Sequence, residues 1–160
     1  MIFFKTEVKD TGTYGRGLFL LEPVTKGQII GILTMDCGVM TEDEYQSEQA
    51  ANNEIIVMTA VRWIGRYFLY GDKIGSEEFI NHSENPTMLY HCGICFATRD
   101  LIAGEELTAD YKYFLAEKDV FAFDDSNTKS SVDGISGREA LLSSARELIK
   151  LIENNPEWEK

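Results

Sequence analysis

Two short polar segments carry the residue types that a catalytic or binding site needs. Residues 79–86 read FINHSENP, and residues 104–111 read GEELTADY. Asn81 in the first segment can fix a backbone turn, because an asparagine side chain hydrogen-bonds to nearby backbone groups. The second segment ends in Tyr111, whose phenol joins an apolar ring to a hydrogen-bonding hydroxyl. Together they predict a site in which a polar loop meets a tyrosine.

A serine hydrolase is one chemistry that the first segment could suggest. Such an enzyme needs a serine hydroxyl that is hydrogen-bonded to a histidine. His82 and Ser83 are neighbours, and adjacent residues of an extended segment point to opposite faces. This pair is therefore a poor candidate for a nucleophile and its base.

A metal site would have to be drawn from His91, Cys92 and Cys95, with His82 as a fourth ligand. A single Cys-x-x-Cys is a weak zinc signal, and in a strand the two sulfurs would lie on opposite faces. We expect two small buried hydrophobic residues and no metal. The chain has three cysteines, an odd number that argues against a disulfide framework and fits a reducing compartment.

Four segments, taken in order, resemble motifs of the SET-domain protein lysine methyltransferases. Residues 14–19 (YGRGLF) are similar to the Gly-x-Gly motif, and residues 36–38 (DCG) fall where the family has Tyr-x-Gly. Residues 79–86 resemble the Arg-Phe-x-Asn-His-Ser core with its following proline, and residues 104–111 match Gly-Glu-Glu-Leu-Thr-x-Asp-Tyr. The resemblance implies a protein-lysine N-methyltransferase that uses S-adenosyl-L-methionine, either a histone-lysine N-methyltransferase or an enzyme for another basic protein.

Methyl transfer to lysine makes demands that tyrosines can meet. A free lysine amine titrates near pKa ~10.4, so the site must desolvate the amine and release its proton before the nitrogen can attack. The amine must also lie in line with the bond from the methyl group to sulfur. Tyrosine rings can line a narrow apolar channel and attract a cation, while their hydroxyls accept hydrogen bonds.

The resemblance also assigns roles to individual residues. It implies that Tyr111 is the catalytic tyrosine and that the Gly-x-Gly backbone lies against the methionine part of the cofactor. Asn81 and His82 would contact the adenosine and amino-acid parts. The complete expected cofactor-binding set is Arg16, Gly17, Leu18, Asn81, His82, Tyr111 and Phe114.

In the family, a C-terminal aromatic closes the lysine channel and stacks on the adenine. The candidates here are Tyr113, Phe114, Phe121 and Phe123. We expect Phe114 to take this role because it is nearest the catalytic motif; the alternative is that these rings only anchor the following segment to the core.

The number of methyl groups transferred depends in the family on a switch residue two positions before the catalytic tyrosine. That residue is Ala109, and some members with a small residue there supply a tyrosine from a neighbouring strand. Tyr90 is the candidate, so we assign it a catalytic role beside Tyr111 and favour monomethylation. If Tyr90 does not fill this space, a wider channel would allow di- or trimethylation.

Three positions depart from the family pattern. Asp36 replaces the tyrosine of Tyr-x-Gly, Glu78 replaces the arginine before Phe79, and Thr87 replaces the asparagine after the proline. These departures leave open a non-catalytic SET-fold protein that binds cofactor or a lysine peptide, or an interaction module. Tyr111 favours the enzyme, since a binding module does not need its hydroxyl.

The elements that must position these residues are mostly strands. Short apolar runs bounded by glycines predict strands near 18–21, 29–33, 55–61, 67–70, 88–90 and 94–97. The resemblance implies a mainly β SET-domain fold over residues 1–115, with small curved sheets of the β-clip type and a pseudoknot-like threading. We expect no pre- or post-SET zinc modules, so the resemblance implies a minimal SET domain.

Two capping-box patterns predict helices within this framework. Thr41 and Glu44 open a short helix that continues to about Ala50, and Ser136 and Glu139 open a C-terminal helix at about 137–154. This helix has one apolar face, which we expect to dock on its own domain, with a homodimer as the alternative. We expect residues 116–160 to form an acidic connector and a helix that together replace the post-SET region. Within the connector, we expect residues 118–133 to be a mobile loop.

Charge sets expectations about partners. The net charge is −12, which opposes direct nucleic-acid binding and favours a basic, lysine-containing protein or peptide substrate. No apolar run is long enough to span a membrane, and the first residues do not resemble a signal peptide. We expect an intracellular protein of the cytoplasm or nucleus.

Overall fold

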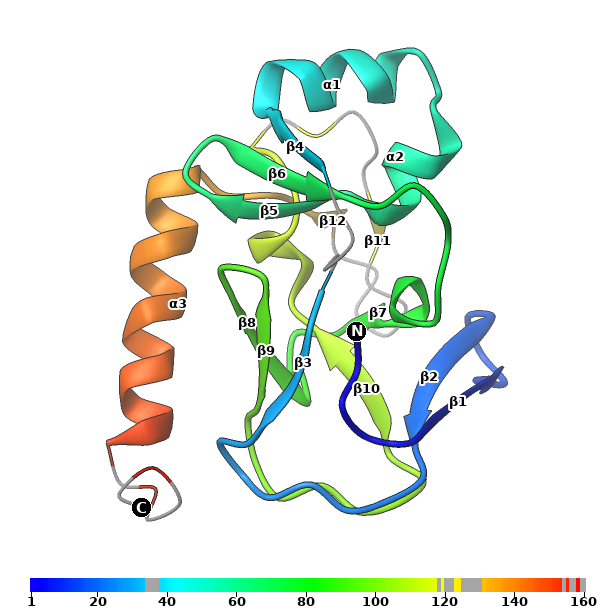
Figure 1. The fold of residues 1–160 in the computed structure, drawn as a ribbon, viewed down its shortest axis with the longest axis vertical. Coiled ribbons are helices and arrows are strands. Elements are labelled where there is room, and N and C mark those ends of the chain that lie inside the picture. The colour runs from blue at the N-terminus through cyan, green and yellow to red at the C-terminus, as the bar shows by residue number, and fades with distance from the viewer. Residues whose placement is uncertain are drawn as a thin grey trace.

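The computed structural model describes residues 1–33, 38–117, 119, 123–124, 131–153, 155 and 158. Within this part of the chain the fold is mainly β, with a long helix near the C-terminus (Figure 1). The expected fold class is therefore confirmed. No helix in these ranges is both long and apolar enough to cross a membrane.

The largest sheet has seven strands and is centred on β10. Its order is β1-β2-β10-β8-β9-β3, with β7 also paired to β10. The strands are β1 (Thr6–Asp10), β2 (Arg16–Leu20), β3 (Ile29–Ile32), β7 (Asn81–His82), β8 (Met88–His91), β9 (Ile94–Ala97) and β10 (Glu106–Ala109). Because β10 is antiparallel to β2 but parallel to β7 and β8, three polar segments of the sequence converge on one strand.

A second sheet has the order β4-β6-β5 and lies at the other end of the molecule, beneath two short helices (Figure 1). Its strands are β4 (Gly38–Thr41), β5 (Val61–Ile64) and β6 (Tyr67–Tyr70), and the helices are α1 (Glu42–Ala50) and α2 (Glu54–Thr59). Two 3-10 turns, η1 (Glu77–Phe79) and η2 (Tyr111–Tyr113), join these parts to the main sheet, and β11 (Phe123–Asp124) pairs with β12 (Ser131–Val132).

The predicted capping box at the start of α1 is present. The Thr41 hydroxyl accepts a hydrogen bond from the Glu44 amide at 3.3 Å, and the Glu44 carboxylate accepts one from the Thr41 amide at 2.7 Å. Each bond satisfies an amide that the first helical turn leaves open, so this short helix begins at a defined residue.

The strand predicted over residues 55–61 is wrong, because most of that run is helix α2. Asn53 caps this helix by accepting a hydrogen bond from the Ile56 amide at 3.5 Å. Ile56 and Thr59 are buried three positions apart, which is a helical and not a strand period. An apolar run of this length fits either element, and here the cap decides.

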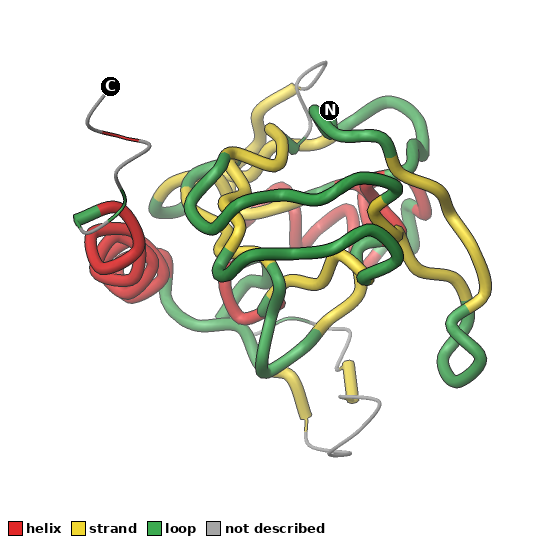
Figure 2. The backbone as a smooth tube through the Cα atoms, turned by 90° about the horizontal axis from the view of Figure 1, so that it is seen from below, coloured by secondary structure: helices red, strands yellow, loops and turns green. Residues whose placement is uncertain are grey.

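The C-terminal helix α3 (Gly137–Ile152) packs on its own domain and ends two residues before the expected position. Ala140 and Leu151 are buried in the main core, and the His91 Nδ1 atom is hydrogen-bonded to the Ser144 hydroxyl at 2.8 Å. Figure 2 shows α3 along one side of the strands, with the β1–β2 hairpin projecting on the other side.

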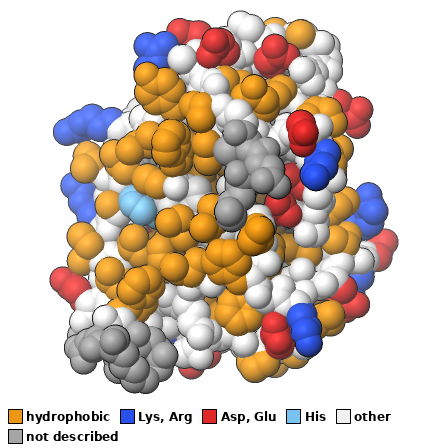
Figure 3. All heavy atoms as spheres, in the orientation of Figure 1, with side chains coloured by type: hydrophobic (Ala, Val, Ile, Leu, Met, Phe, Trp, Pro, Cys, Tyr) orange, Lys and Arg blue, Asp and Glu red, His pale blue; other side chains and the backbone are white. Residues whose placement is uncertain are grey.

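The main core lies between the large sheet and α3. Its fully buried side chains include Leu18, Ile30, Met88 and Leu107. On the surface, hydrophobic side chains gather over the left and centre of the face in Figure 3, and most of the visible charged groups lie at its rim.

Candidate active site

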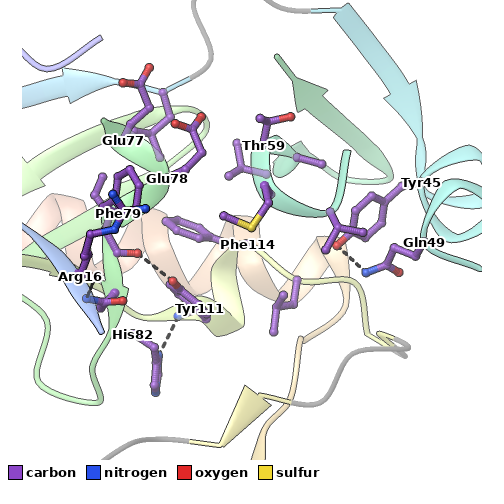
Figure 4. Close-up of a pocket in the computed structure, with 18 of the residues that line it drawn as sticks. Arg16, Tyr45, Gln49, Thr59, Glu77, Glu78, Phe79, His82, Tyr111 and Phe114 are labelled. Atoms are coloured by element: carbon purple, nitrogen blue, oxygen red, sulfur yellow. Dashed lines mark hydrogen bonds between the residues drawn. The ribbon is translucent and has the colours of Figure 1, made fainter. Parts of the chain in front are cut away.

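A cavity of about 460 Å³ lies between the large sheet and the two short helices. Its walls come from the start of β2, from α1 and α2, from the η1–β7 segment and from the turn at η2 (Figure 4). Its volume is within the range of about 300–1,000 Å³ that small-molecule sites occupy. The cavity is therefore large enough for a cofactor-sized ligand.

The two polar sequence segments meet in this cavity through parallel strand pairing. Asn81 lies opposite Thr108, and His82 lies opposite Ala109. The Ser83 amide extends the pairing by donating to the Ala109 carbonyl at 3.0 Å. The β7–β10 pair thus places the end of the second segment directly beside the first.

Tyr111 is held at both of its ends by the first segment. Its amide donates to the His82 Nδ1 atom at 3.1 Å, and its hydroxyl donates to the Ile80 carbonyl at 2.7 Å. Because Nδ1 accepts this bond, the neutral tautomer of His82 carries its proton on Nε2. Backbone and ring contacts together fix the position of the phenol.

The phenol of Tyr111 is neutral at physiological pH. Burial, together with the nearby negative charge of Glu106, raises its pKa to about 12. Its proton points to the Ile80 carbonyl, and a phenol oxygen also carries lone pairs that can accept hydrogen bonds. The hydroxyl can accept a hydrogen bond from an amine without itself becoming charged.

Phe114 extends the aromatic wall of the cavity beside Tyr111. The two rings are stacked with centroids 5.5 Å apart. The backbone around Phe114 is fixed by Arg62, whose amide donates to the Phe114 carbonyl at 3.0 Å and whose guanidinium donates to the Leu115 carbonyl. Strand β5 therefore fixes the chain that follows Tyr111.

Glu106 connects three of the matched segments. Its carboxylate accepts hydrogen bonds from the Asn81 amide group at 2.7 Å and from the Tyr14 hydroxyl at 2.6 Å. The same Asn81 nitrogen also donates to the Arg16 carbonyl at 3.0 Å. One carboxylate on β10 thereby holds the start of β2 against β7.

Five of the seven expected cofactor-binding residues line the cavity: Arg16, Asn81, His82, Tyr111 and Phe114. Gly17 and Leu18 do not. A Cβ atom on Gly17 would lie 2.3 Å from the Glu106 carboxylate, so the glycine leaves room for that group. Leu18 is fully buried in the core.

Tyr90, which we expected in the lysine channel, does not reach the cavity. It is 3% exposed, its hydroxyl donates to the Arg62 carbonyl, and its ring meets the Phe114 ring edge-on at 4.6 Å. Burial raises its pKa well above the usual range. Tyr90 therefore supports Phe114 from the side of the core.

The far end of the cavity contains residues that our sequence analysis missed. The Tyr45 hydroxyl donates to the Asp119 carboxylate at 3.2 Å and accepts from the Gln49 side chain at 2.7 Å. Burial and the charge of Asp119 raise the pKa of Tyr45. Among the described residues the buried Gln49 carbonyl oxygen has no hydrogen-bond partner. Tyr45 and Gln49 are four residues apart on a capped helix, which places them on the same helix face, and this spacing was the sequence signal for the pair.

Comparison with known families agrees with this geometry. A model of the SET domain matches residues 15–112, which is more than half of the chain and includes both segments around Tyr111. The chain belongs to the SET-domain family. SET domains are generally protein lysine methyltransferases. No curated protein matches the chain.

The three departures of this SET domain differ in their consequences. Thr87 is structural here: its hydroxyl accepts from the Thr108 amide at 2.8 Å and donates to the Glu106 carbonyl at 3.1 Å. Glu78 lies on the cavity wall, and Asp36 lies outside the described residues. The Phe121 and Phe123 side chains, the other expected channel aromatics, also lie outside them.

The residues of the cavity fit S-adenosyl-L-methionine, the methyl donor that SET-domain methyltransferases generally use. The cofactor has an aromatic base, a sulfonium and an amino-acid end. Phe114 offers an aromatic surface, and Arg16, Glu78 and His82 offer charged and polar groups in the same cavity. A purely apolar cavity would not match this set of groups.

Proposed function

We propose that this SET-domain protein transfers a methyl group from S-adenosyl-L-methionine to a lysine side chain of a basic protein. The observation that carries the proposal is the position of Tyr111. Its neutral phenol is held by the Ile80 carbonyl and the His82 ring at the wall of a cofactor-sized cavity. A binding module has no need to fix a hydroxyl in this way.

The cavity favours the reactive form of the substrate. When bound, the cofactor supplies an electrophilic methyl group. The Tyr111 and Phe114 rings reduce hydration and so disfavour a charged ammonium, which shifts a lysine amine toward its neutral, nucleophilic form. The Tyr111 oxygen accepts a hydrogen bond from that amine and orients it for in-line attack. Arg16, Asn81 and His82 would hold the cofactor.

A basic substrate is supported by charge. The chain has a net charge of −12, and Glu77 and Glu78 lie on the cavity wall. Such a field attracts a lysine-rich protein, with histones as one example, and repels nucleic acid. A protein of the cytoplasm or nucleus would encounter such substrates.

The position of Tyr90 bears on the extent of methylation. Its hydroxyl is bonded to the Arg62 carbonyl and Tyr90 does not line the cavity, so we do not expect it to fill the space beside the substrate nitrogen. We therefore expect dimethyl- and trimethyl-lysine among the products. Intact-mass measurement of a methylated peptide would identify them, and a product that stops at monomethyl-lysine would contradict this expectation.

The decisive experiment is methyl transfer by the purified protein to histones and to other basic proteins, with labelled S-adenosyl-L-methionine. In Tyr111→Phe we expect transfer to fall by about 100-fold, the usual effect of removing one positioned hydrogen-bonding group from a reaction centre. Tyr113→Phe is the matched control, since the Tyr113 hydroxyl bonds to Glu147 at 2.8 Å, away from the cavity.

Two results would contradict the proposal. Absence of cofactor binding and of labelled methyl in every basic substrate would exclude the enzyme. Cofactor binding without transfer would instead support a non-catalytic SET-domain protein that binds the cofactor.

A further inference from the structure

Three arginine and glutamate side chains line the cavity among the residues that the structure describes. They are the Arg16 guanidinium and the Glu77 and Glu78 carboxylates. Figure 4 shows all three at the same end, near Phe79 and away from Tyr45. This end of the cavity therefore presents both signs of charge to a ligand.

The Arg16 guanidinium is positioned by a ring. It lies over the Phe79 ring, 4.3 Å from its centroid. Stacking on an aromatic face leaves the edge of the guanidinium, with its forked N–H donors, available to a carboxylate. The Arg16 carbonyl is tied separately to Asn81, so the backbone beneath the side chain is fixed.

The two carboxylates differ in their existing partners. Glu77 is paired with the N-terminal ammonium of Met1 at 3.2 Å. Glu78 accepts a hydrogen bond from the Gly75 amide through Oε2 at 2.6 Å, which orients the carboxylate. Burial raises the pKa of Glu78, and a cation bound beside it would reverse that shift. Glu78 is the better placed of the two to take a cationic ligand group.

We propose that Glu78 accepts the α-ammonium of S-adenosyl-L-methionine and that Arg16 binds its α-carboxylate. The inference rests on the proposed function and assigns this chain's own residues to the amino-acid end of the cofactor. The family pattern has an arginine at the position of Glu78, so the carboxylate there is a departure from that pattern.

Charge is consistent with this assignment. The α-ammonium and α-carboxylate of the cofactor are opposite in sign to Glu78 and Arg16, and Glu77 is already paired with the Met1 ammonium. A basic side chain of the protein substrate is the competing occupant of Glu78. The two occupants differ in a testable way, because only the cofactor brings its ammonium to Glu78 when no protein substrate is present.

The test combines ligand truncation with residue truncation in calorimetric titrations of the whole chain. The ligands are S-adenosylhomocysteine, its analogue without the α-amine and its analogue without the α-carboxylate. For the unmodified protein we expect each truncation to weaken binding by about 10-fold, the lower end for hydrogen bonds to charged groups.

The variants should abolish these penalties selectively. In Glu78→Gln, the ligand without its α-amine should bind less than about 2-fold more weakly than S-adenosylhomocysteine. The ligand without its α-carboxylate should still lose about 10-fold in affinity. In Arg16→Met the pattern should be reversed. Glutamine can still accept the Gly75 bond, and Glu54→Gln, an exposed site outside the cavity, controls for net charge.

Each remaining outcome overturns a different claim. If loss of the α-amine from the ligand still weakens binding to Glu78→Gln by about 10-fold, the inference is excluded and the protein substrate is favoured as the partner of Glu78. An unmodified protein that does not bind S-adenosylhomocysteine excludes the inference and the proposed function together. Thermal unfolding of each variant ensures that lost affinity is not lost structure.

Discussion

The two ends of the cavity are built in different ways. At the Asn81 end, strand pairing and short hydrogen bonds to Glu106 fix the groups, and backbone atoms contribute many of the contacts. At the Tyr45 end, the groups depend on side chains of α1 that reach Asp119, across 70 residues or more of sequence. On the proposed function, we expect the cofactor at the first end and the protein substrate at the second.

The substitution Asn81→Ala tests this difference between the two ends most directly. The change removes the donor to Glu106 and to the Arg16 carbonyl, so we expect the free energy of unfolding to fall by about 1 to 2 kcal/mol. Affinity for S-adenosylhomocysteine should fall by more than about 10-fold. Denaturant unfolding and calorimetry measure both quantities, with the exposed Asn85→Ala as control. Unchanged affinity would show that this end does not bind the cofactor.

A smaller effect is expected at the other end in Tyr45→Phe. The ring keeps its stacking on Phe68, at 4.4 Å between centroids, but the hydrogen bond to Asp119 is lost. Stability should fall by about 1 kcal/mol. Affinity for S-adenosylhomocysteine should change by less than 2-fold, while the KM for a protein substrate rises. A loss of cofactor affinity as large as that in Asn81→Ala would remove the distinction between the two ends.

The smallest effect belongs to His91, which lies under α3 and outside the cavity. Burial lowers its pKa below the ordinary 6.5, so the unfolded chain binds a proton more readily than the folded chain. Stability from this group is complete above pH 6.5 and declines as the pH falls toward the lowered value. His91→Gln should reduce the dependence of the unfolding free energy on pH between pH 6.5 and the lowered pKa. It should leave cofactor affinity unchanged. An unaltered slope would contradict this prediction.

Sequence reasoning identified the Asn81 end because its chemistry lies in contiguous motifs. The pairing of residues 79–86 with residues 104–111 follows from the family resemblance, and the cap at Thr41 follows from local hydrogen bonding. The helical state of residues 54–59 was missed, since a short apolar run is compatible with the helical and with the strand period. The cap formed by Asn53 distinguishes the two.

The remaining misses are tertiary in origin. Tyr90 could face the cavity or the core, and only the packing of Phe114 and Arg62 around it decides. The contact of Gln49 with Asp119 joins positions 70 residues apart, and nothing in either local pattern indicates the partner. Gly17 resembles a ligand-facing glycine in sequence, yet its open side is filled by Glu106.

The bond between the Tyr111 amide and the His82 ring closes a loop of 29 residues. Closing a loop of that span costs entropy before the contact stabilises the chain, so we expect this bond to form after the intervening hairpin. If the proposed function holds, we expect a partly folded chain to lack methyltransferase activity. Protection of the Tyr111 amide from hydrogen exchange would report, on one proton, whether a molecule is competent to react.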